Sequence, residues 1–249
     1  MMYYTEMDYL TVGFIIGSVL GLTGSGGALV AIPLFMYLGL TIKEASFLSL
    51  IAVVLAGAFN LLQQYKTAQV KNAMIMIGAS LLGSIVLIPV KEITPNIVIV
   101  ILLTLISIYS LITMWMPKKA EVTQTKSHPL WLTLVVGFIL GGLTTLTGLG
   151  GGVLLMPIFV GIFRMPMPQA LATSLVTILG SSFISFLLQW QKGAMLPALD
   201  KVLFLVTGIA LSTFVLKQVI KRISPPQADL LRKWVFSGIV LFAMIKFYS

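Results

Sequence analysis

The sequence predicts an all-α integral membrane protein of two inverted repeats, each a glycine-broken helical hairpin followed by three transmembrane helices. Three observations lead to this fold class. Of the 249 residues, 58% are hydrophobic and only 9% are charged, and the mean hydropathy is +1.06. Several uncharged runs reach the roughly 20 residues that a helix needs to cross the hydrocarbon core. The chain also carries two nearly identical glycine-rich stretches at matching places in its two halves.

The two repeated stretches run from Gly13 to Phe35 and from Gly137 to Phe159. When one is shifted onto the other by 124 positions, eleven of 23 residues coincide. An internal repeat of this length indicates a duplicated architecture. We therefore divide the chain into a first membrane repeat, a polar linker and a second membrane repeat, at residues 1–117, 118–129 and 130–249.

The first repeat opens with an uncharged run of 34 residues, 9–42. This run is too long for one straight span and too short for two spans joined by a turn. Glycines loosen its middle and Pro33 removes a backbone donor. We expect a helix to about Leu22, a break, and a shorter arm to about Leu40. Three further spans are expected at residues 45–64, 72–90 (ended by Pro89 and Lys91) and 93–116.

The second repeat follows the same order. Residues 130–163 are again uncharged over 34 positions. The segment 169–189 resembles the span that begins at Ala45, because Ala170-Leu-Ala-Thr-Ser-Leu matches Ala45-Ser-Phe-Leu-Ser-Leu. Two more spans are expected at residues 202–219 and 228–248.

Two topologies fit these segments. If each long segment crosses once, the basic residues divide eight against eight between the two sides. If each long segment turns at its glycines and returns to its own side, they divide eleven against five. The positive-inside rule favours the second topology, in the inner (cytoplasmic) cell membrane with both termini outside. Each repeat then crosses the membrane three times, and this odd number places the second repeat upside down relative to the first, as is common in secondary transporters.

The two glycine breaks are the main candidate for a binding site. Irregular backbone at membrane depth must face protein or a watery cavity. Successive N–H groups in a glycine turn, followed by a helix start, form a concavity that suits an anion. The alternative is that these small residues only allow close helix packing. Because the breaks occur twice in register, we predict anion binding by Thr23, Gly24, Ser25, Gly26, Gly27, Thr147, Gly148, Gly150, Gly151 and Gly152.

Polar side chains on the second span of each repeat are further candidates. Asn60 and Gln64 are four residues apart on one helical face. Ser181 and Gln189 belong to a polar stripe at helical spacing. Neutral donors bind a desolvated oxyanion without the cost of burying a countercharge. The alternative is that the hydroxyls bond back to their own helix and the amides lie near the interface. We predict that these four residues contribute to the site.

Several classes of function are disfavoured by the sequence. All seven acidic residues lie in or beside loops, so no intramembrane carboxylate is available as a proton relay. His128 is the only histidine and lies in the linker, which leaves no pair for proteolysis and no metal cluster. Neither glycine stretch ends in the Gly-Lys-Ser/Thr of a phosphate loop. We expect no enzymatic activity, cofactor, metal or nucleic-acid partner; a small anion and the lipid bilayer are the expected partners, and the oligomeric state stays open.

Both glycine stretches contain the motif Thr-Gly-x-Gly-Gly, followed after five residues by Pro33 or Pro157. With this doubled motif the chain resembles the sulfite exporter TauE/SafE family of membrane transporters, over almost its whole length. The resemblance implies a permease for small sulfur-containing oxyanions, such as sulfite, sulfoacetate or other organosulfonates, with export as the expected direction. The competing interpretation is a channel-like or accessory membrane subunit in which the glycines only pack helices.

Overall fold

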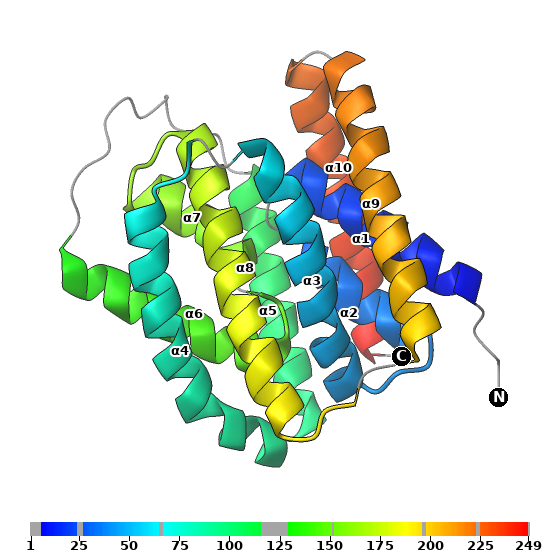
Figure 1. Cartoon of the computed structure of the whole chain (residues 1–249). Helices are drawn as coiled ribbons and strands as arrows, with labels where there is room; N and C mark the ends of the chain where they lie inside the picture. The colour runs from blue at the N-terminus through cyan, green and yellow to red at the C-terminus, as the bar shows by residue number, and fades with distance from the viewer. Residues whose placement is uncertain are drawn as a thin grey trace.

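The computed structural model of the protein describes residues 6–23, 27–64, 67–115, 129–150, 152–195, 198–222 and 225–248. Within these ranges every regular element is a helix, and the predicted all-helical fold is confirmed (Figure 1). The helices are α1 (Glu6–Thr23), α2 (Gly27–Tyr37), α3 (Ile42–Gln64), α4 (Val70–Ile93), α5 (Asn96–Trp115), α6 (Leu130–Thr147), α7 (Gly152–Pro157), the π-helix η2 (Ile158–Ile162), α8 (Met167–Gln191), α9 (Leu199–Arg222) and α10 (Pro225–Tyr248).

Six of the described helices are long and apolar enough to cross a membrane. A helix suits this setting because it satisfies its backbone hydrogen bonds internally. The outer faces of α4 and α5 carry exposed apolar side chains, for example Leu82, Ile85, Ile101 and Leu105. Such faces suit contact with lipid. The six segments are Ile42–Leu61, Val70–Ile93, Asn96–Thr113, Leu130–Thr147, Pro168–Gln191 and Leu199–Leu216.

Helix boundaries follow the glycine stretches. In the first stretch α1 ends at Thr23 and α2 begins at Gly27, and in the second α6 ends at Thr147 and α7 begins at Gly152. The expected end of a span at Pro89 and Lys91 is wrong, because α4 continues through both residues to Ile93. A proline is tolerated inside a membrane helix when neighbouring elements satisfy the freed backbone groups. Within this helix the Lys91 side chain has buried oxygen partners on α3 and α8.

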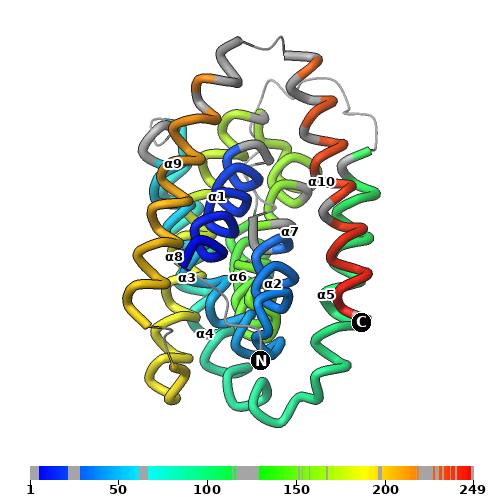
Figure 2. The backbone as a smooth tube through the Cα atoms, turned by 90° about the vertical axis from the view of Figure 1, so that its right-hand side faces the viewer, coloured from blue at the N-terminus to red at the C-terminus, as the bar shows by residue number. Residues whose placement is uncertain are grey.

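The first helix of each half of the chain packs along a helix of the other half: α1 lies along α9, and α6 lies along α4 (Figures 1 and 2). Small residues bring the paired backbones close together. A Cβ added at any of four glycines would lie 3.0 Å or less from a backbone oxygen of the partner helix. These close approaches pair Gly13 with Leu205, Gly17 with Ile209, Gly137 with Met76 and Gly141 with Ser80.

Helices α3 and α8 pack against each other in antiparallel orientation. At one end of the bundle the rings of Phe47 on α3 and Phe186 on α8 stack with their centroids 5.4 Å apart. At the other end the backbone N–H of Gln69, beyond the end of α3, donates to Thr173 Oγ1 on α8 at 3.0 Å. We name the second end the Gln69 end. The first is the Glu92 end, where Lys192 Nζ lies 3.9 Å from the Glu92 carboxylate.

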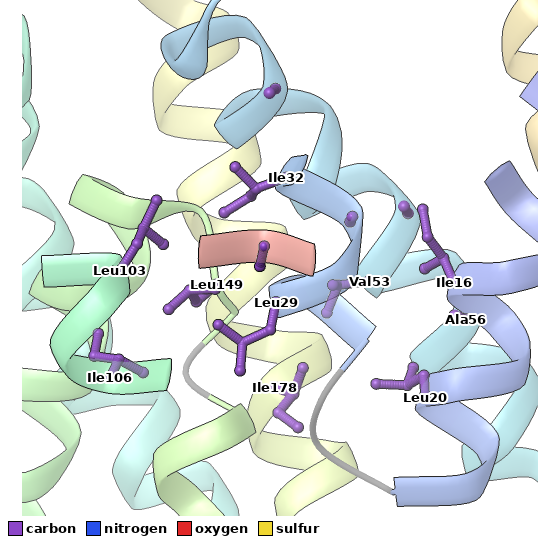
Figure 3. Packing of buried hydrophobic residues seen from close by; sticks show 14 of the residues in the cluster. Ile16, Leu20, Leu29, Ile32, Val53, Ala56, Leu103, Ile106, Leu149 and Ile178 are labelled. Atoms are coloured by element: carbon purple, nitrogen blue, oxygen red, sulfur yellow. The ribbon is translucent and has the colours of Figure 1, made fainter. Parts of the chain in front are cut away.

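The buried apolar core lies between the two halves. Leu29 at the start of α2 and Leu149 in the second glycine stretch belong to one cluster with Val53 of α3 and Ile178 of α8 (Figure 3). Leu29 is fully buried and Leu149 is almost so. The start of α2 and the turn after α6 therefore lie in the interior, next to α3 and α8.

Candidate functional site

The second glycine break is a left-handed turn fastened to α3. Gly148 caps α6 with φ of 76°, and its N–H donates to the Thr144 carbonyl at 2.8 Å. Gly150 follows with φ of 66°. Only glycine adopts such angles without steric cost. The hydroxyl of Ser49 on α3 donates to the Gly148 carbonyl at 2.7 Å, which holds the turn against the centre of the bundle.

Neither glycine of this turn has room for a side chain. A Cβ at Gly148 would collide with the backbone and the hydroxyl of Ser46. A Cβ at Gly150 would lie 2.7 Å from Ser182 Oγ and 3.0 Å from Val53 Cγ1. The break therefore depends on glycine twice, for its backbone angles and for its close approach to α3 and α8.

A buried hydroxyl network lies along the last turns of α6, which lead into the break. Ser185 Oγ on α8 lies 3.1 Å from Thr145 Oγ1 on α6 and 3.3 Å from Ser84 Oγ on α4. Ser84 also donates to the Gly141 carbonyl at 3.2 Å. Gln189 Nε2 donates to the Thr145 carbonyl at 3.4 Å. Polar groups of three helices thus converge in the interior of an otherwise apolar bundle.

Lys91 brings a buried amino group to this network. Its side chain is only 7% exposed, and its Nζ donates to Gln189 Oε1 at 2.6 Å and to Ser46 Oγ at 3.0 Å. An ammonium has three N–H donors. Among the described residues these two neutral oxygens are its hydrogen-bond acceptors, and no carboxylate forms an ion pair with it. The neighbouring acid, Glu92, pairs instead with the exposed Lys192. The cluster therefore contains a lysine amino group without a carboxylate partner, and its charged form is costly to bury.

Two hydroxyls beside the break have unused hydrogen-bonding capacity. Within the described part of the chain, Thr144 Oγ1 and Ser182 Oγ are buried without a hydrogen-bond partner. An unsatisfied buried group of this kind costs about 1–3 kcal/mol. Ser182 borders Gly150, and the Thr144 carbonyl accepts the hydrogen bond that caps α6. Both oxygens could donate to a ligand that reached the turn.

The first break is described only at its edges. Thr23 ends α1 and Gly27 begins α2. The predicted site residues Gly24, Ser25 and Gly26, together with the side chains of Thr23 and Gln64, lie outside the part that the structure describes.

Asn60 on α3 lies close to the first break. It is buried, and its Nδ2 donates to the Ala56 carbonyl of its own helix at 2.8 Å. A Cβ at Gly21 on α1 would lie 3.2 Å from Asn60 Oδ1. The amide therefore bonds back to α3 with its nitrogen and directs its oxygen toward α1, just before the break.

The structure brings some of the predicted residues together and separates others. Gln189 belongs to the hydroxyl network, Gly148 and Gly150 form the turn that follows α6, and Gly152 begins α7 just after that turn. Thr147 is buried, donates to the Leu143 carbonyl at 2.7 Å and accepts from the Leu149 N–H at 3.3 Å, so it stabilises the turn. Ser181 donates to the Ile178 carbonyl of its own helix at 3.3 Å, as the alternative interpretation of the hydroxyls expected. Gly151 lies outside the described residues.

Sequence analysis missed Lys91 and Ser46. Lys91 precedes Glu92 at the end of an apolar run, where a lysine ordinarily extends to the membrane interface. Its burial comes from α3 and α8 packing over it, which the linear sequence does not display. The cluster consequently differs from the expected set of purely neutral donors, because it contains a buried charge.

The described helices, their exposed apolar faces and their buried polar cluster define a multi-pass α-helical membrane protein. A sequence profile of the family described as "Sulfite exporter TauE/SafE" matches residues 9–247 of the 249-residue chain. The chain therefore belongs to the sulfite exporter TauE/SafE family of membrane transporters. Searches of curated proteins and of solved structures returned no match to the chain.

Proposed function

We propose that the protein is a secondary transporter that exports small sulfur-containing oxyanions, such as sulfite, sulfoacetate or other organosulfonates, across the inner cell membrane. Family membership supports the class of substrate. The observation in the structure that carries the proposal is the buried hydroxyl network on α4, α6 and α8, which lies next to the Gly148–Gly150 turn in the chain. Two further buried hydroxyls, Thr144 and Ser182, lack hydrogen-bond partners among the described residues. Hydroxyl and backbone N–H donors can replace the water that a sulfite or sulfonate group loses when it leaves solution.

We propose further that the two halves are inverted repeats. Helices α3 and α8 hold matching places in the two halves and run in opposite directions. The packing of α1 against α9 and of α6 against α4 fits the same symmetry, because in each case the first helix of one half lies along the fourth α-helix of the other. Transport sites commonly lie at such repeat interfaces, where discontinuous helices meet.

Contacts of α6 support the hairpin topology for the second repeat. Gly137, early in α6, contacts Met76 near the start of α4 at the Gln69 end. Gly148 at the other end of α6 contacts Ser46 near the start of α3, toward the Glu92 end. The chain then returns, because Gln169 near the start of α8 accepts from the Gln69 side chain at 3.2 Å. The competing topology is a single crossing by α6, which is long and apolar enough to span alone.

Cysteine labelling distinguishes the two topologies, and the native chain contains no cysteine that would interfere. We expect Lys192→Cys to react with a membrane-impermeant maleimide on intact cells, and Thr67→Cys to react only after permeabilisation. Both positions are exposed. In the hairpin topology they lie on opposite faces with Thr67 in the cytoplasm, whereas eight crossings place them on the same face. Equal reactivity of the two variants on intact cells would contradict the hairpin topology.

Flux measurements test the function itself. The purified protein in liposomes should take up radiolabelled sulfite and sulfoacetate with saturation kinetics, and unlabelled sulfite should compete for that uptake. Protein-free liposomes provide the background rate. A channel-like protein would show flux that does not saturate, and an accessory subunit would show none. Either result would reject the transporter proposal.

A further inference from the structure

We infer that Lys91 is the countercharge of the transported anion. In the structure without substrate, the Gln189 amide oxygen accepts a hydrogen bond from the Lys91 ammonium, and an oxygen of the bound anion replaces it there. The inference deepens the proposed function and rests on it. It concerns a cluster of three side chains, Lys91 on α4, Ser46 on α3 and Gln189 on α8.

The charge balance around Lys91 is the first argument. The carboxylates of α3 and α4 at this end do not neutralise Lys91. Lys43 adds a further cation, whose Nζ donates to the Glu92 backbone carbonyl at 3.1 Å. Glu44 accepts from the N–H and the hydroxyl of Thr41, and the Glu92 carboxylate pairs with Lys192. The carboxylate and Lys192 are both more than half exposed. A buried charge of this kind is expensive, and a methionine of similar volume would cost less. The presence of a lysine at this buried position is explained if binding of the anion requires a positive charge there.

The hydrogen bonds of the cluster are the second argument. Lys91 uses two of its three donors on neutral oxygens, and an anionic oxygen forms the stronger, charge-assisted bond. Ser46 accepts from Lys91 with its hydroxyl oxygen and is fully buried. Among the described residues its own hydroxyl proton has no acceptor, so it can be donated to a ligand. An oxyanion that displaces the Gln189 oxygen would meet the ammonium and a hydroxyl together.

The position of the cluster is the third argument. It joins two helices of the first half, α3 and α4, to α8 of the second half. It also touches the glycine break directly, since Ser46 contacts Gly148 and Gln189 Nε2 donates to the Thr145 carbonyl at 3.4 Å. An anion that took the place of the Gln189 oxygen at Lys91 would release the hydrogen bond that joins α4 to α8 at this point. Binding would thereby alter the interface across which the halves of a transporter move.

Replacement of Lys91 by methionine tests the inference against a matched control. In detergent-purified protein, we expect Lys91→Met to weaken sulfite binding, measured by sulfite-dependent thermal stabilisation, about tenfold to a hundredfold. This range corresponds to one lost hydrogen bond to a charged group. Lys192→Met removes an equal charge from the exposed surface of the same end and should change the affinity by less than about twofold.

Thermal stability separates a binding lysine from a structural one. Without sulfite, Lys91→Met should melt at the same temperature as the wild type or higher, because an unpaired buried charge is removed. Gln189→Glu places a carboxylate against the ammonium with little change of shape. This internal anion should stabilise the fold and lower the affinity for sulfite, since the two compete for one cation.

Each outcome decides the inference. Wild-type sulfite affinity in either Lys91→Met or Gln189→Glu would overturn it, even if Lys91→Met folds poorly and only Gln189→Glu can be measured. In that case transport by the wild type would leave the proposed function standing. If the wild type itself neither binds nor transports sulfite or a sulfonate, the proposed function fails first.

Discussion

We expect Gly148→Ala and Gly150→Ala each to abolish sulfite transport, whereas Gly78→Ala should leave it unchanged. The first two residues adopt φ of 76° and 66°, a left-handed conformation that costs roughly 1–2 kcal/mol for a residue with a Cβ. Each Cβ would also strike a neighbour, Ser46 in one case and Ser182 in the other. The turn must therefore move, and its N–H groups and the adjoining hydroxyls lose their alignment.

Gly78 is the matched control because it lies in the middle of α4 with no atom within 4 Å of a Cβ added there. Alanine at this position should stabilise the helix by about 0.5–1 kcal/mol. All three variants are compared by flux in liposomes at equal reconstituted amounts, and by melting temperature in detergent. Wild-type flux from both Gly148→Ala and Gly150→Ala would limit these glycines to helix packing and remove the break from the proposed site.

We also expect a membrane potential to drive anion flux without a proton or sodium gradient. Among the described carboxylates, Glu6, Glu44, Glu92 and Asp200 are exposed and Asp8 is half-buried in the first turn of α1. None of these five is placed to carry protons through the interior. An inside-negative potential contributes about 2.3 kcal/mol per elementary charge per 100 mV to anion export. This energy sustains a gradient of roughly fiftyfold for a single charge. Lys91 stays with the protein, so the charge that moves is that of the substrate.

The measurement uses liposomes in which valinomycin and a potassium gradient set the potential, with equal pH on both sides and no sodium. Sulfite flux should follow the sign of the potential and vanish when the potential is zero and sulfite is equal on both sides. Coupling to sodium is the competing mechanism, because backbone carbonyls at the breaks can coordinate Na⁺ without any acid. Flux that ignores the potential and requires a proton or sodium gradient would contradict voltage-driven export.

Local properties of the sequence determined the class of this protein. Long uncharged runs specify membrane-spanning helices, because lipid offers no hydrogen-bond partners and a helix pairs its own backbone N–H and C=O groups. The predicted glycine stretches coincide with the ends of α1 and α6 and the starts of α2 and α7, because glycine and proline act on the backbone around them. The doubled glycine motif led to the family, which the profile match confirms.

The tertiary structure alone decided which side chains form the polar cluster. Lys91, Ser46 and Gln189 come from three helices, and only the packing of those helices turns a lysine at the end of an apolar run into a buried cation. In the same packing the Ser181 hydroxyl donates to its own helix, and the Ser182 hydroxyl lies beside Gly150 with no hydrogen-bond partner among the described residues. Hydropathy and spacing describe one helix at a time, whereas the burial and pairing of a polar group depend on its neighbours from distant parts of the chain.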